Sequence, residues 1–485
     1  MFLLLLLLLV GCKSRNQDEV FTIPSVYVNV SSADLDSMMR NKHYKASAFV
    51  SIVSSKGDTL LSDSVDNIHT RGNTTFGHNK KAFTVKLRKK KKLLDLDTGK
   101  RFVLLANAYD ESHIRNAIAF DLAQRMGLKS PKYSYVSLYI NSEYRGLYQM
   151  TNKVEDLMDF KNNGFLIEGN SNVELPRHLT TERKETIISS YNLIISNIEK
   201  CFDCDSCYDS LQRWMDLVSF AKYYILQEIS LNMDAPGPGS FFKYASDEDG
   251  GKLHAGPVWD FDKFFATIHR GWNYEWEKNE IMACAGVIDS SGHVYSGLLL
   301  HCLWKREEFR NLVKDLYNNE ISTICHTYIE SGRIDSLVYY LRPEAKRDYR
   351  TNVGWRWFAY EEETQRVRAF LKQRIEFLDW FFNSPKENMV CITYLDSCFR
   401  GSGGGDKIAQ VWIPSKKIIK VPKLLAISFN YTPIPDALYY KGTNIVVSNK
   451  SIINSEDEFE LKWRKPSPQE VLLRRIRKKL HYWGL

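Results

Sequence analysis

Two aspartates separated by a single phenylalanine end the apolar segment GPVWDFD, residues 256–262. If this segment is a strand, the side chains of Asp260 and Asp262 point to one face, with their Cα atoms about 7 Å apart. Two carboxylates held this close repel each other unless a cation lies beside them. A hard divalent ion such as Mg²⁺ prefers oxygen ligands of this kind. The alternative interpretation is a pair of solvated acids on a turn.

A third aspartate, Asp234, follows an apolar helical stretch and lies in a loop rich in Pro and Gly. An Asp on a loop, followed after a short strand by a metal-binding Asp, is the arrangement of kinase-type phosphotransferases. In these enzymes the first Asp orients or deprotonates the attacking hydroxyl, and the second binds the metal on the phosphates. Asp234 is therefore the candidate catalytic residue. Asp260 and Asp262 are the candidate metal ligands, and Asp260 is the favoured principal ligand.

Phosphate groups also need cationic partners, and the N-terminal part of the chain offers them. Arg71 begins the segment RGNTT, and Lys80 and Lys81 follow a few residues later. An Arg side chain suits bidentate contact with phosphate, whereas Lys provides a point charge. Read alone, this segment is only a basic hairpin.

Composition indicates a folded protein of several units. A chain of 485 residues predicts about two or three domains, and its hydrophobic content of 44% argues against general disorder. The net charge of +8 is mild for this length, and much of it lies in two runs, residues 86–92 and 474–479. No nucleic-acid partner is expected, because these runs do not form one continuous basic face.

The first residues resemble an export signal. Residues 2–10 form an apolar run, which is too short to span a bilayer, since a helix needs about 20 residues, but matches the hydrophobic region of a signal peptide. The following LVGC resembles a bacterial lipobox, in which the lipidated Cys becomes the first mature residue. We expect residues 1–20 to be signal peptide and tether, with lipid on Cys12 anchoring an exported protein in the cell envelope (outer membrane, periplasmic or surface face). One alternative is a plain signal peptide without lipid. The other is a misplaced start codon, because no Lys or Arg precedes the apolar run.

The hydrophobic pattern changes period along the chain. Alternation predicts strands and hairpins over residues 21–87, and a short strand over 102–106. A helix capped by Ser112 and ended by Gly127 follows, and then two strands at 135–140 and 145–151. Helical spacing returns from 208 to 231 and from about 296 to 379.

The sequence of the C-terminal part predicts β structure followed by a helix. Residues 390–462 contain short apolar runs without helical spacing, which predicts a small, sandwich-like β domain. Residues 471–480 predict a basic amphipathic helix. Its cationic face is either simply solvated or binds an acidic partner or a lipid surface.

Several motifs occur in an order and spacing that resemble the spore coat protein H (CotH) kinase family. They are RGNTT, KKAFTVKL, FVLLANAYDESHIRNAIAFDLAQRMGL, YVSLYINSEYRGLYQMTNKVE, LNMDAPG and GPVWDFD. The resemblance runs from about residue 24 to 382. It implies an α+β fold of the atypical protein-kinase type, with a β-rich N-terminal lobe and a helical C-terminal lobe over residues 21–384. The small β domain would then occupy 385–465 and the basic helix 466–485.

The resemblance also implies ATP and Mg²⁺ as cofactors and phosphorylation of Ser or Thr in a protein substrate. Asp234 matches the family's catalytic-loop Asp, and Asp260 and Asp262 match its metal-binding end. Arg71 matches the RGN motif.

The resemblance assigns further basic and polar positions. Lys81 and Lys153 match recurring basic positions and are candidates for phosphate contact, and Glu155 is expected to pair with one of these lysines. Arg115 and Asn116 match the family's RN. Their alternative role is a buried network that ties the helix to the sheet.

One position departs from ordinary kinases, which place an Asn five residues after the catalytic Asp to hold a second metal. Here Gly239 occupies that position and Ser240 follows it. A serine hydroxyl binds magnesium more weakly, so two-metal catalysis is in doubt and a pseudokinase remains open.

The leading hypothesis is a CotH-type protein kinase that transfers the ATP γ-phosphate to Ser or Thr of an exported or surface protein. The second hypothesis is a non-catalytic, kinase-like surface module that binds a partner protein or a glycan. The third is a metal-dependent phosphohydrolase or nucleotidyl transferase that uses the same carboxylates.

Overall fold

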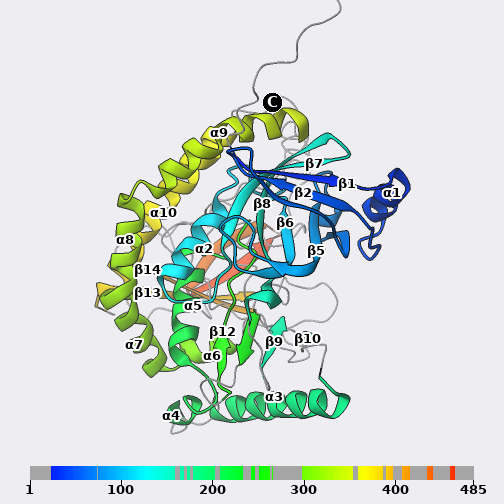
Figure 1. The fold of residues 1–485 in the computed structure, drawn as a ribbon. Coiled ribbons are helices and arrows are strands. Elements are labelled where there is room, and N and C mark those ends of the chain that lie inside the picture. Colours follow the sequence, from blue (N-terminus) through cyan, green and yellow to red (C-terminus); the bar gives the residue numbers. More distant parts are fainter. Residues whose placement is uncertain are drawn as a thin grey trace, which may run out of the picture.

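The structure is a computed structural model of the chain (Figure 1). It describes residues 23–73, 75–158, 164–168, 172–174, 179–202, 208–232, 242–245, 251–262, 265, 298–352, 359–385, 389–396, 407–414, 434–440 and 459–464. Within these residues, every helix is too short or too polar to cross a lipid bilayer.

The N-terminal part is built on an eight-stranded sheet in the order β3-β2-β1-β7-β8-β6-β5-β4. Only β1 and β7 pair in parallel; the other neighbours are antiparallel. The strands are β1 (Ser25–Asn29), β2 (Phe49–Val53), β3 (Thr59–Ser64), β4 (Asn67–Arg71), β5 (Ala82–Lys91), β6 (Gly99–Leu105), β7 (Tyr133–Ile140) and β8 (Glu143–Asn152). Helix α1 (Ser32–Arg40) follows β1, and a 3-10 turn, η1 (Thr75–Gly77), follows β4.

This sheet curls back on itself. Ala46, just before β2, exchanges two backbone hydrogen bonds of 2.9 Å with Ile68 of β4, although these strands lie near opposite ends of the strand order. The alternating pattern of the sequence explains the curl, because the inward side chains form one apolar core. Its members include Val26, Val28, Ile52, Phe83, Phe102 and Leu138.

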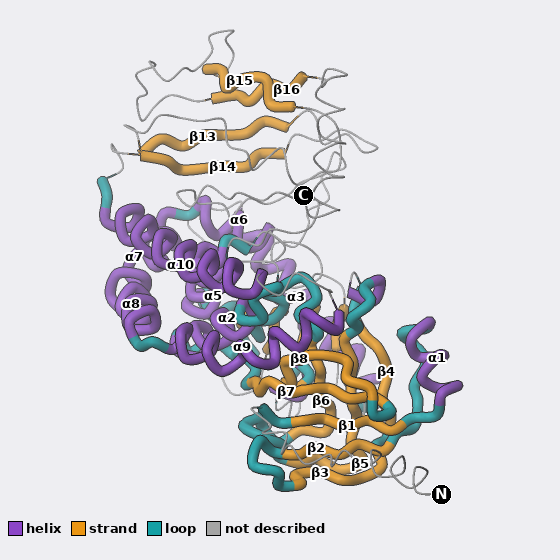
Figure 2. The backbone as a smooth tube through the Cα atoms, turned by 90° about the horizontal axis from the view of Figure 1, so that it is seen from above, coloured by secondary structure: helices purple, strands orange, loops and turns teal. Residues whose placement is uncertain are grey.

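Helices make up most of the second part and pack around a larger apolar core. They are α2 (Arg115–Arg125), α3 (Thr181–Phe202), α4 (Tyr208–Leu211), α5 (Leu217–Ser230), α6 (Leu298–Lys305), α7 (Glu307–Leu316), α8 (Ser322–Glu330), α9 (Arg333–Asn352) and α10 (Ala359–Asn383). Most residues of α5 are buried, as expected of a helix that is apolar on most sides. Figure 2 shows the helices gathered on one side of the N-terminal strands.

A second, four-stranded sheet is formed by strands that precede α3 and strands that follow α5 in the sequence. It has the order β10-β9-β11-β12 and consists of β9 (Phe165–Glu168), β10 (Asn172–Glu174), β11 (Phe242–Ala245) and β12 (Leu253–Ala255). The 3-10 turn η2 (Val154–Leu157) follows β8. Met215, just before α5, forms a bridge with Leu253, so β12 and the segment after it lie next to α5.

The C-terminal strands form two antiparallel pairs, β13 (Met389–Asp396) with β14 (Lys407–Pro414) and β15 (Ile434–Tyr440) with β16 (Phe459–Arg464). Figure 2 shows both pairs beyond α6 and α10. The division of the chain into domains stays a prediction. The basic helix expected at 471–480 lies outside the described residues.

The structure confirms the α+β class and corrects several local predictions. Residues 21–87, predicted as strands and hairpins, also contain the helix α1. The helix expected from 208 to 231 is interrupted between α4 and α5, where Asp216 caps α5 by accepting the Ser219 N–H at 2.8 Å. Ser112 does not cap α2. Its hydroxyl bonds to Asp110, and the other carboxylate oxygen of Asp110 accepts the first helical N–H, that of Arg115, at 2.9 Å.

Candidate active site

The segment that carries Asp260 and Asp262 is a loop after β12, so the strand on which the shared-face arrangement depended does not form. Asp260 has φ 67°, in the left-handed region, which breaks the alternation of a strand. As a result Asp260 is exposed, whereas the side chain of Asp262 is buried. The two carboxylates therefore do not share one face in the way that strand geometry requires.

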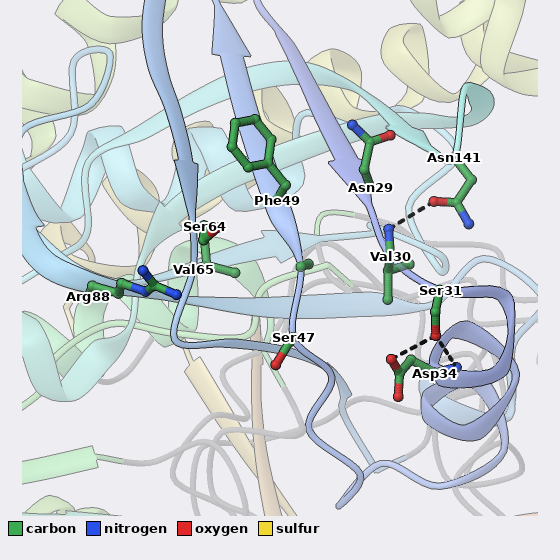
Figure 3. Close-up of a pocket in the computed structure, with 11 residues that line it drawn as sticks. Asn29, Val30, Ser31, Asp34, Ser47, Phe49, Ser64, Val65, Arg88 and Asn141 are labelled. Atoms are coloured by element: carbon green, nitrogen blue, oxygen red, sulfur yellow. Dashed lines mark hydrogen bonds between the residues drawn. The ribbon is translucent and has the colours of Figure 1, made fainter.

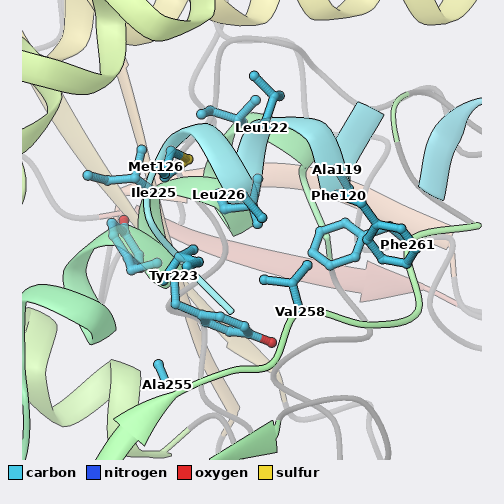
Figure 4. Packing of buried hydrophobic residues seen from close by; sticks show 14 of the residues in the cluster. Ala119, Phe120, Leu122, Met126, Tyr223, Ile225, Leu226, Ala255, Val258 and Phe261 are labelled. Carbon is cyan, nitrogen blue, oxygen red and sulfur yellow. The ribbon is translucent and has the colours of Figure 1, made fainter. Parts of the chain in front are cut away.

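Three backbone donors hold this loop to the helical core. Val258 N–H donates to the main-chain oxygen of Lys129 at 2.8 Å, and Phe265 N–H donates to that of Ser230 at 3.2 Å. Between them, Phe261 N–H donates to the side-chain Oδ1 of Asn116 at 2.8 Å. The side chains of Val258 and Phe261 are fully buried beside α2 and α5 (Figure 4).

Arg71, the last residue of β4, reaches this loop from the curled sheet. Its guanidinium carbon lies 5.4 Å from the centre of the Trp259 ring, in cation–π geometry. Burial lowers the pKa of Arg71, and the nearby carboxylates of Glu155, Asp260 and Glu168 act in the opposite direction. Its Nη1 is buried and makes no hydrogen bond within the described part of the chain.

The expected ion pair of Glu155 with a lysine is present, because Lys153 Nζ bonds to Glu155 Oε1. The pair is local: Lys153 precedes η2 and Glu155 lies within it, whereas an ordinary kinase places this Glu on a distant helix. The other carboxylate oxygen of Glu155, Oε2, is buried without a hydrogen-bond partner among the described residues. The Glu155 carboxylate and Asp260 both interact electrostatically with Arg71 and act to raise its pKa.

His69 and Tyr223 complete the surroundings of these charges. His69 lies two residues before Arg71 on β4; burial and the charges of Lys45, Lys153 and Arg71 lower its pKa to about 4, so the imidazole is neutral at pH 7. On the other side, burial and the charge of Asp260 raise the pKa of Tyr223 in α5. Asp260 thus interacts electrostatically with a cation of the sheet and with a buried phenol of the helical part.

The two lysines of the basic segment have partners near their own strand or inside the fold. Lys81 donates to the main-chain oxygen of Phe76, and its ammonium lies 4.3 Å from the centre of the Phe76 ring. Lys80 is buried in an ion pair with Asp348, with Nζ 3.0 Å from Oδ2. The expectation that Lys80 faces a phosphate is wrong, because its charge is used inside the fold.

Arg115 and Asn116 belong to buried networks, as the structural alternative predicted. Arg115 has no exposed side-chain surface and pairs with Asp110 and with Glu363 of α10, the latter at 2.8 Å. Asn116 Nδ2 donates to Asn107 Oδ1 at 3.1 Å, while its Oδ1 accepts Phe261 N–H. Asn116 therefore connects the sheet, α2 and the Asp260 loop.

Other predicted residues lie outside the described part of the chain. These are Asp234, Gly239, Ser240 and Cys12. Among the described residues, no group of three or more His, Cys, Asp or Glu side chains has the arrangement of a metal site. The roles of Asp260 and Asp262 as metal ligands stay predictions.

A pocket of about 490 Å³ lies elsewhere, at the end of β1 and the start of β2, beside the start of α1 (Figure 3). Its lining includes Phe49, Arg88 and Asn141, and none of the predicted site residues. It is therefore separate from the group around Arg71.

A comparison against known families identifies the family of this chain. The family described as CotH kinase protein matches residues 68–378, well over half of the chain. This protein belongs to the CotH kinase family. No curated protein matches the chain. The family implies a kinase-related function and, in general terms, the use of ATP and a metal.

Sequence reasoning missed four residues of the site: His69, Glu168, Tyr223 and Trp259. The spacing of His69 and Arg71, two apart on a strand, places them on one face and could have revealed His69. Trp259 is part of the GPVWDFD motif, directly before Asp260. No signal in the sequence indicates Glu168 or Tyr223, because tertiary contacts alone bring them near Arg71 and Asp260.

Proposed function

We propose that this protein is a CotH-type protein kinase that transfers the γ-phosphate of ATP to Ser or Thr of an exported or surface protein. The proposal combines family membership with one feature of the site, the buried Nη1 of the half-buried Arg71 side chain. A buried donor without a hydrogen-bond partner is costly unless a ligand satisfies it. Nη1 of Arg71 is such a donor among the described residues, and it lies near the exposed Asp260.

The residues around Arg71 suit a complex of ATP and Mg²⁺. The guanidinium would bind a phosphate oxygen, and Lys153, held by Glu155, would supply a second cation. Magnesium in phosphotransferases is usually held by one or two carboxylates together with substrate phosphates, so a cage of three protein ligands is not required. Asp260, the exposed one of the two acids, would provide the carboxylate, and the bound ion would neutralise charge on the transferring phosphate.

The hydroxyl of the substrate needs a partner that orients it and accepts its proton. We assign this role to Asp234, from its place after α5 and its match to the catalytic-loop Asp of the family. Phosphoryl transfer demands little covalent help, so correct positioning of the two reactants supplies much of the rate.

Transfer of labelled γ-phosphate from ATP tests the proposal. Purified protein is incubated with a panel of exported proteins, with Mg²⁺ or with EDTA. We expect labelling that requires Mg²⁺ and falls by about 10²-fold or more in Asp234→Ala and Asp260→Ala, as for loss of a catalytic group. Equal labelling by the wild type and both variants would exclude this activity. Partner binding that survives both substitutions, without any labelling, would support a non-catalytic surface module.

The proposed location is the cell envelope, where lipid attached to Cys12 after export would anchor the protein. Radiolabelled palmitate fed to expressing bacteria should enter the wild-type protein and not Cys12→Ser. The same variant should move from the membrane fraction to the soluble fraction. Incorporation of label into Cys12→Ser would contradict the anchor and leave the kinase proposal untouched.

A further inference from the structure

Three amide side chains, those of Gln149, Asn107 and Asn116, form a hydrogen-bonded chain that ends at the backbone of the Asp260 loop. This polar relay is buried throughout. Gln149 of β8 accepts from Asn107 Nδ2 at 3.3 Å, and Asn107 Oδ1 accepts from Asn116 Nδ2 at 3.1 Å. Asn116 Oδ1 then accepts Phe261 N–H at 2.8 Å. Each side chain is at most 6% exposed, so none of these amides can exchange its partner for bulk water at low cost.

The relay has a fixed direction because an amide side chain has distinct donor and acceptor ends. A backbone N–H can only donate, so the Oδ1 of Asn116 must face Phe261 and its Nδ2 must face Asn107. Asn107 is then obliged to present its oxygen to Asn116 and its nitrogen to Gln149. The backbone N–H of Phe261 thereby sets the orientation of all three amides, as far as Gln149 of β8.

The loop needs such a tether because Asp260 adopts an unfavourable backbone conformation. Its φ of 67° lies in the left-handed region, which is unfavourable for a residue that carries a Cβ. Its neighbours Trp259 and Phe261 are buried, and the Trp259 ring stacks on Phe120 of α2 with centres 6.2 Å apart. Asp260 is the exposed residue between them and is near enough to Arg71 to raise the pKa of that side chain, so a rotation of the Phe261 peptide would reorient the Asp260 carboxylate.

We infer that Asn116 is a positioning residue that holds Asp260 in the orientation required for a metal-bound nucleotide. It touches neither substrate nor metal and acts through the Phe261 N–H. The inference rests on the proposed function, since it assigns Asp260 to the metal. The inference gives Asn116 a different role from its neighbour Arg115. The ion pairs of Arg115 with Asp110 and Glu363 hold α2 against α10.

The test compares Asn116→Leu, which removes the acceptor at similar volume, with Gln149→Leu at the far end of the relay. ATP binding is measured by calorimetry twice on each folded protein, with Mg²⁺ and with EDTA. For Asn116→Leu we expect affinity for ATP with Mg²⁺ to fall about tenfold or more, the worth of one charge-assisted contact. Affinity in EDTA should stay within about twofold, because Arg71 and Lys153 are unchanged. Gln149→Leu should change neither affinity by more than about twofold.

Hydrogen exchange of the peptide containing Phe261 provides a second readout that does not depend on nucleotide. Asn116→Leu should accelerate exchange at the Phe261 amide, and Gln149→Leu should not. If Asn116→Leu does not fold, Asn107→Leu replaces it and should give smaller changes in the same direction. An equal loss of affinity with and without Mg²⁺, or unchanged exchange at Phe261, would overturn the inference. Absence of ATP binding by the wild type would instead refute the proposed function, while the exchange data would still decide whether Asn116 anchors the loop.

Discussion

Lys80 and Asp348 form an ion pair inside the fold, with Nζ 3.0 Å from Oδ2, although 268 residues separate them. Lys80 also donates to the main-chain oxygen of Leu147 at 2.6 Å, and Asp348 Oδ1 accepts Leu147 N–H at 3.0 Å. Burial alone would raise the pKa of Asp348, but the charge of Lys80 and a hydrogen bond from His113 lower it to about 2. The pair therefore joins the segment before β5, strand β8 and helix α9.

Lys80→Met should destabilise the protein by about 3–5 kcal/mol, because it leaves a buried carboxylate without its cation. The double variant Lys80→Met with Asp348→Leu should lose less than the sum of the two single variants, as measured by urea unfolding. Lys86→Met is the matched control, since Lys86 pairs with Asp66 at the surface and should cost at most about 1 kcal/mol. Strictly additive losses would show that the buried pair is not coupled.

Gly146 in β8 faces the same ion pair, and its replacement tests how tightly the pair is packed. Its φ is 126°, and a Cβ placed there would lie 2.0 Å from Asp348 Oδ1. Gly146→Ala should therefore cost clearly more than the roughly 1–2 kcal/mol of left-handed strain alone. Gly127→Ala measures that strain without a clash, because φ is 77° and no atom lies within 4 Å of the added Cβ. Equal melting temperatures for the two variants would contradict this account.

The local features of the fold could be predicted because they depend on residues close in sequence. The strand alternation around Val26 and Val28 gives β1, and the turn at Asn141 and Ser142 joins β7 to β8, with φ of 51° and 67°. The pairing of Lys153 with Glu155 is also local. In each case the deciding contacts span only a few residues.

The features that the sequence analysis missed depend on distant partners. Lys80 looks like a free cation in the sequence, and only the packing of α9 brings Asp348 to it. Likewise, the alternation of Asp260 and Asp262 suggests a strand, but the bond from Phe261 N–H to Asn116, 145 residues away, holds a loop instead. Tertiary contacts therefore decide the site geometry where local pattern is ambiguous.

His69→Gln should make the protein less sensitive to acid. Burial lowers the pKa of His69 from 6.5 to about 4, so the folded state binds this proton less readily than the unfolded chain. A histidine with a lowered pKa contributes stability above its unfolded value and loses it as the pH falls from 6.5 toward 4. Urea unfolding at several pH values should show a flatter decline in His69→Gln. The exposed His43→Gln serves as control, and an identical decline in all three proteins would refute the assignment.

Arg71→Gln should weaken ATP binding, because it removes the buried donor that the phosphate is proposed to satisfy. Loss of a hydrogen bond to a charged group costs about 1.5–3 kcal/mol, which corresponds to roughly a tenfold to hundredfold loss of affinity. The loss should appear with Mg²⁺ and with EDTA alike, since Arg71 would contact phosphate directly, and this separates it from Asn116→Leu. Arg88→Gln makes the same change in net charge at an exposed position of β5 and should leave binding within about twofold. Equal losses in the two Arg variants would mean that general positive charge, and not the guanidinium above Trp259, attracts the nucleotide.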